Sequence, residues 1–114
     1  MGKLSTHVLD TTLGKPAANL TVYLYKKENE TYALLKEVMT NSDGRCDEPL
    51  LTGDSLEIGG YELVFDVLNY FKSKNIDSPF LQDVVIRFHV SNVDDNYHVP
   101  LLITPYSYST YKGS

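Results

Sequence analysis

The sequence contains a single cysteine, Cys46, and no tryptophan. One cysteine rules out a disulfide within the chain, and a lone thiol is more often a packed residue than a nucleophile. No run of eighteen apolar residues and no basic start followed by an apolar block is present. We therefore expect no membrane span and no signal peptide. The expected location is a reducing cytoplasm, or the periplasm or another compartment if a leader was removed.

Positive charge is also scarce. Ten Lys and Arg residues stand against fifteen Asp and Glu residues, which gives a net charge of −5. Because a nucleic-acid partner requires a basic surface, this balance argues against one. The chain is 42% hydrophobic and has nine tyrosines, which favours one domain, residues 1–114, that is rich in strands.

Alternation of apolar and polar residues is the main structural signal. It predicts a hairpin from residues 20–26 and 32–40. Further strands are expected at residues 5–10, 61–65 and 84–90, with two final strands broken at Thr104-Pro105. Asn41-Ser42-Asp43-Gly44 is a strong turn signal that places Arg45 just beyond a tight bend.

One segment has helical periodicity, with Asp66 as a candidate N-cap before Val67, Tyr70 and Phe71. Seven or eight short strands, one short helix and no βαβ rhythm predict an all-β (mainly β) fold, an antiparallel β-sandwich. Pro100 falls inside a strand pattern, which normally indicates an edge strand or a bulge. We expect a local irregularity there.

The candidate chemical groups are histidines and an arginine. Any single histidine in a strand is more often structural than catalytic, and His89 is interpreted as structural or exposed. His7 and His98 each point away from flanking apolar residues. Taken alone, each could be a surface residue, and Arg45 a solvated loop charge.

Together, three segments carry a resemblance. They are Leu4-Ser5-Thr6-His7-Val8-Leu9-Asp10, Thr40-Asn41-Ser42-Asp43-Gly44-Arg45 and the C-terminal segment from Tyr97. In order and spacing they resemble signature blocks of the transthyretin-related family, in its branch of 5-hydroxyisourate hydrolases. His98-Val99-Pro100-Leu101-Leu102 and the final tetrapeptide resemble the enzymes rather than the hormone carriers.

The resemblance implies a transthyretin-like sandwich that hydrolyses 5-hydroxyisourate to 2-oxo-4-hydroxy-4-carboxy-5-ureidoimidazoline in urate breakdown, without cofactor or metal. It also implies a homotetramer, a dimer of dimers with sites between dimers. The catalytic residues that it implies are His7, Arg45 and His98. The substrate-binding tail that it implies is Tyr111, Lys112, Gly113 and Ser114.

The residue types suit this chemistry. Water attacking an amide-like carbonyl needs a base, a proton donor for the departing nitrogen and positive charge for the oxyanion. Two histidines can share the proton transfers, although the sequence leaves open which one is the base. Two histidines are also too few ligands for a usual catalytic zinc, and Cys46 is not spaced as a third.

Three positions depart from the enzyme pattern: Lys112 replaces the usual Arg, Asn96 the usual His and Ser107 the usual Gly. Lysine and arginine are not equivalent where two parallel hydrogen bonds are required. Two alternatives follow, a catalytically weakened hydrolase paralogue and a transthyretin-like carrier of small molecules of the thyroid hormone type. The combination of His7, Arg45 and His98 favours the enzyme, because a carrier would favour an apolar channel.

Overall fold

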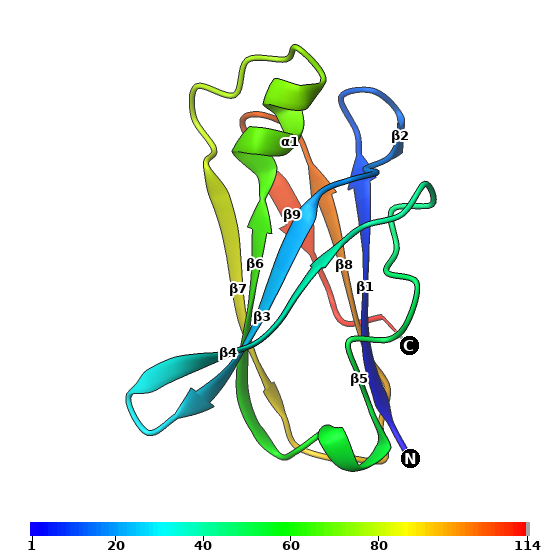
Figure 1. Cartoon of the computed structure of the whole chain (residues 1–114), viewed down its shortest axis with the longest axis vertical. Helices are drawn as coiled ribbons and strands as arrows, with labels where there is room; N and C mark the ends of the chain where they lie inside the picture. The colour runs from blue at the N-terminus through cyan, green and yellow to red at the C-terminus, as the bar shows by residue number, and fades with distance from the viewer. Residues whose placement is uncertain (114) are drawn as a thin grey trace.

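The computed structural model describes residues 1–113 and consists of two β-sheets packed face to face (Figure 1). The elements, in chain order, are β1 (Lys3–Asp10), β2 (Lys15–Pro16), β3 (Thr21–Glu28), β4 (Thr31–Met39), β5 (Leu51–Thr52), the 3-10 turn η1 (Gly53–Ser55), β6 (Gly59–Asp66), α1 (Val67–Ser73), β7 (Asp83–Val90), β8 (Tyr97–Ile103) and β9 (Tyr108–Thr110). One sheet has the order β2-β1-β8-β9, with β5 also paired to β1, and the other has the order β4-β3-β6-β7.

The predicted mainly β sandwich is confirmed, with one exception to its antiparallel character. β1 and β8 pair in parallel, in an unbroken register from Leu4 opposite Tyr97 to Asp10 opposite Ile103. A parallel pair requires a long connection, and here the connection includes the whole second sheet and α1. Alternation within a strand does not reveal the direction of its partner, so the sequence could not predict this pairing.

The predicted helix is confirmed as α1, and Asp66 caps it by accepting a hydrogen bond from the backbone N–H of Asn69. Its buried face consists of Val67, Tyr70 and Phe71, as the periodicity indicated. At seven residues α1 is short, and none of the helices within residues 1–113 is long and apolar enough to cross a membrane.

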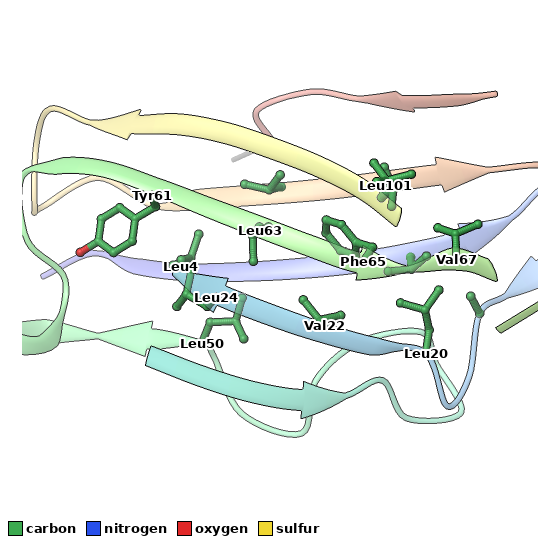
Figure 2. Packing of buried hydrophobic residues seen from close by; sticks show 14 of the residues in the cluster. Leu4, Leu20, Val22, Leu24, Leu50, Tyr61, Leu63, Phe65, Val67 and Leu101 are labelled. Carbon is green, nitrogen blue, oxygen red and sulfur yellow. The ribbon is translucent and has the colours of Figure 1, made fainter. Parts of the chain in front are cut away.

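Alternation along the strands builds the core between the sheets. Figure 2 shows Val22 and Leu24 of β3 beside Leu63 and Phe65 of β6, facing Leu4 on the other sheet. All five side chains are fully buried. On β1 the burial alternates, so that Leu4, Thr6 and Val8 point into the core while Ser5 and His7 face outward. The core therefore determines which face of the sheet presents the histidines.

Asp10, which ends the motif containing His7, has a structural role. Its buried carboxylate accepts hydrogen bonds from the backbone N–H groups of Thr12 and Leu13 and from the hydroxyl of Tyr70, at 2.7 Å. These bonds fix the turn after β1 and join β1 to α1. Burial, together with the hydrogen bond to Asp10, strongly raises the pKa of Tyr70.

The strand that contains Pro100 is not an edge strand, because β8 is flanked by β1 and β9 and its register with β1 is continuous through Pro100. The irregularity lies on the β9 side. There, the regular pairing of β8 with β9 ends at Leu101 opposite Thr110. One isolated β-bridge follows in the same register, between His98 and Gly113. The register places Tyr111 opposite Pro100, which has no N–H to donate, so the ladder is interrupted at that pair.

Candidate active site

The register of β1 and β8 brings the two predicted histidines together on the outer face of their sheet. Ser5 lies directly opposite His98, and His7 lies opposite Pro100. Since Ser5 and His7 are on the same face of β1, His7 and His98 are diagonal neighbours across the pair. Both imidazoles are half-buried. Two residues more than ninety positions apart in sequence therefore form one site.

Arg45 reaches this site through the predicted turn, which docks against the other side of β1. The Asn41 side chain accepts hydrogen bonds from the backbone N–H groups of Asp43 and Arg45. Val8 donates its N–H to the carbonyl of Gly44 at 2.8 Å, and the backbone of Arg45 forms an isolated antiparallel β-bridge with His7. Gly44 has φ 76°, and a Cβ there would lie 2.4 Å from the Val8 carbonyl oxygen, so the docking requires glycine.

The hydrogen-bond partners of the imidazoles constrain their protonation. His7 Nε2 lies 3.0 Å from the backbone carbonyl oxygen of Asp43, which can only accept. His7 Nε2 therefore carries a hydrogen, and Nδ1 is the ring nitrogen left to take up a proton. His98 is held by the other nitrogen: its Nδ1 lies 2.9 Å from Ser5 Oγ, which leaves Nε2 for a substrate.

Both imidazoles are tuned toward the neutral form. Burial, followed by the positive charge of Arg45, lowers the pKa of His7, although the Asp43 carbonyl opposes part of this shift. Burial also lowers the pKa of His98, with Arg45 and then His7 adding to the effect. At neutral pH both rings are therefore largely uncharged and able to accept a proton, beside a permanent positive charge.

The C-terminal tail reaches His98 through Gly113. The Gly113 N–H donates to the His98 carbonyl at 2.7 Å, and a Cβ on Gly113 would lie 2.9 Å from His98 Cδ2. Only glycine allows so close an approach of the tail backbone to the ring. Tyr111 is 61% exposed, and Ser114 lies outside the described residues.

Lys112 is not brought together with the histidine pair. Its Nζ lies 3.4 Å from Asp95 Oδ2 and 5.1 Å from the ring centroid of Tyr97. Tyr97 precedes His98 on β8 and is buried on the opposite face of that strand. The side chain of Lys112 thus anchors the tail to the start of β8, while the neighbouring Gly113 contacts His98.

Two contributors to the site were missed in the sequence. Ser5 stands inside the motif around His7 and faces outward in the alternation, but its partner His98 belongs to a strand whose pairing the sequence does not reveal. Asp43 contributes a backbone carbonyl, which carries no signal in residue identity. His89 is exposed on β7, as expected.

Comparison with known proteins identifies the family. The model of the HIUase/Transthyretin family matches residues 4–113, and the chain belongs to this family. It is 47% identical to a 5-hydroxyisourate hydrolase of Pseudomonas aeruginosa, over 100% of this chain and 93% of that protein. It is 51% identical to a 5-hydroxyisourate hydrolase of Deinococcus radiodurans, over 97% of this chain and 95% of that protein.

Solved structures agree with this assignment. The 5-hydroxyisourate hydrolase of Klebsiella pneumoniae is 33% identical, with a TM-score of 0.85 and full coverage of both chains. An (S)-allantoin synthase is 43% identical with a TM-score of 0.93, and the match covers 99% of this chain but 44% of that one. Sea bream transthyretin in complex with thyroxine, at 23% identity and a TM-score of 0.90, shares the fold.

Proposed function

We propose that this chain is a 5-hydroxyisourate hydrolase that forms 2-oxo-4-hydroxy-4-carboxy-5-ureidoimidazoline in urate catabolism. The observation that carries the proposal is the meeting of His7, His98 and Arg45 on one outward face. The pKa values of both imidazoles there are lowered, in part by the positive charge of Arg45. Relatives of similar length that are named for this activity support it.

The proposed mechanism is general acid–base hydrolysis of the six-membered ring. A water molecule transfers one proton to an imidazole as its oxygen bonds to the amide-like carbonyl carbon. Arg45 stabilises the negative charge that develops on the carbonyl oxygen. The carbon–nitrogen bond then breaks, the departing nitrogen takes up a proton from the imidazolium, and the carbonyl becomes the carboxyl group of the product. We assign the proton acceptor of His7 to Nδ1, because Nε2 donates to Asp43. His98 exchanges its proton through Nε2.

The tail completes the proposed site. Gly113 packs on His98 and thereby brings the tail backbone to the imidazole pair. We assign substrate contacts to Tyr111 and to the hydroxyl of Ser114. The side chain of Lys112 instead holds the tail in place. The carrier alternative is supported by likeness of fold alone, since transthyretin is 23% identical.

The activity is tested with 5-hydroxyisourate generated fresh from urate. Its ultraviolet absorbance decays spontaneously, and we expect the chain to accelerate that decay well beyond the uncatalysed rate. Tight binding of thyroid hormone without accelerated decay would support the carrier, and a weak acceleration would support the weakened paralogue.

The lowered pKa values predict the position of the acidic limb of kcat/KM. Both histidines must be neutral to accept a proton, so activity is retained above their lowered pKa values and lost as the pH falls through them. The limb should therefore lie below the ordinary histidine pKa of about 6.5. Proton NMR titration of Arg45→Gln should show both pKa values moving upward. Unchanged titration would mean that Arg45 does not act on the pair.

The placement of Lys112 predicts the effects of two substitutions. Lys112→Arg should be nearly neutral, because arginine can keep both the ion pair with Asp95 and the contact with the Tyr97 ring. Lys112→Met removes both interactions, which together are worth about 0.5–1 kcal/mol at an exposed site, and should lower kcat/KM by roughly two- to fivefold. A rate for Lys112→Arg well above that of the parent would instead favour a forked contact with substrate.

We further propose that the chain acts as a homotetramer, a dimer of dimers, in the cytoplasm. Within residues 1–113, the two sheets each end in an open edge on the same side of the sandwich, β7 and β9, and the three residues of β9 are exposed. Open edges favour pairing with another chain. Light scattering should give about four times the chain mass of 12.9 kDa. A fully active monomer would contradict a site built between subunits.

A further inference from the structure

Ser5 contacts one of the proposed catalytic histidines but has no role in the mechanism proposed above. Its Oγ lies 2.9 Å from His98 Nδ1, and the register of β1 and β8 sets the two residues directly opposite each other. Both side chains are half-buried on the outer face of the sheet. Within residues 1–113, this is the one hydrogen bond made by the His98 side chain and also the one made by the Ser5 side chain.

A hydroxyl differs from a carbonyl as a partner for an imidazole that exchanges protons. The Asp43 carbonyl can only accept, so it fixes His7 with a hydrogen on Nε2. A serine hydroxyl can donate to an unprotonated Nδ1 and, after rotation about its C–O bond, can accept from a protonated one. Ser5 can therefore stay bonded to His98 when the ring is neutral and when it is charged.

We propose that Ser5 is the positioning residue for His98: it fixes the ring so that Nε2 faces the substrate, and it keeps that orientation through both protonation states. The inference rests on the proposed hydrolase function for its kinetic consequence. Its structural consequence is independent of that function. The position of the His98 ring matters because the Gly113 backbone packs against Cδ2 of the same ring.

The test compares Ser5→Ala with Ser5→Thr, which keeps the hydroxyl and suits a strand. Thr21→Val is the matched control. Thr21 is a half-buried strand residue on the other sheet, and its hydroxyl makes no hydrogen bond within residues 1–113. We expect Ser5→Ala to lower kcat about tenfold, less than the roughly 10²-fold expected for loss of the imidazole itself, with KM nearly unchanged. Ser5→Thr should recover most of the rate, and Thr21→Val should match the parent.

Nitrogen-15 NMR of the imidazoles, in the full chain without substrate, separates this inference from the function. Ser5→Ala should change the tautomer balance of His98 while the signals of His7 stay as they are. If the parent lacks hydrolase activity but the His98 signals change in this way, the function fails and the positioning contact stands. Unchanged His98 signals, an undiminished kcat in Ser5→Ala, or a Ser5→Thr variant as slow as Ser5→Ala would each overturn the proposal.

Discussion

Replacing His7 or His98 by asparagine should lower kcat/KM for 5-hydroxyisourate by roughly 10²-fold or more, the range for loss of a positioned acid or base. Both side chains lie on the outer face of the sheet, so the core beneath them is unaffected and the fold should persist. Asparagine preserves polarity and approximate size but cannot exchange a proton near neutral pH. Steady-state kinetics on folded variants, checked by circular dichroism, provide the measurement.

The third histidine supplies the control. His89 is exposed on β7, on the other sheet, and His89→Asn should keep the parent rate. Near-normal turnover of a well-folded His7→Asn or His98→Asn variant would show that the substituted histidine is structural. Equal losses in all three variants would show that the effect does not arise at the proposed site.

Removal of residues 112–114 should abolish most of the activity while changing the free energy of unfolding by no more than about 1 kcal/mol. The stability loss is small because the ion pair of Lys112 with Asp95 joins two side chains that are 52% and 50% exposed. The activity loss is large because Gly113 packs on His98, and the residue after it is assigned to the substrate. Kinetics and chemical denaturation of the same preparation measure both quantities.

A point substitution separates the position of the tail from its presence. Gly113→Ala introduces a Cβ that would lie 2.9 Å from His98 Cδ2, so either the ring or the tail must move. This variant should lose activity although the chain keeps its full length. Full activity in the truncated chain would contradict a catalytic tail, whereas full activity in Gly113→Ala alone would contradict close packing on His98.

Much of the fold could be predicted from local patterns. The hairpin of β3 and β4, the cap at Asp66 and the alternation on β7 depend on neighbours in sequence, and all three were correct. The parallel pairing of β1 with β8 could not be predicted, because it joins segments whose alternation is the same in either direction. The local irregularity expected at Pro100 lies on the β9 side alone, because the missing N–H concerns β9 and not β1.

The site could be predicted as a set of residues but not as an arrangement. His7, Arg45 and His98 were identified through motifs, and the structure brings them together. Lys112 was expected at the substrate, yet its side chain lies against Tyr97. The Lys112 side chain reaches Asp95 and Tyr97, whereas the Gly113 backbone packs on the His98 ring. That distinction depends on the register of the tail with β8, which only the structure supplies.

The most direct test of the central claim is the ultraviolet decay of fresh 5-hydroxyisourate with the parent chain and with the His7→Asn/His98→Asn double variant side by side. We expect rapid decay with the parent and a return to the spontaneous rate with a folded double variant. Decay with the folded double variant as fast as with the parent would contradict hydrolysis at the site formed by β1 and β8.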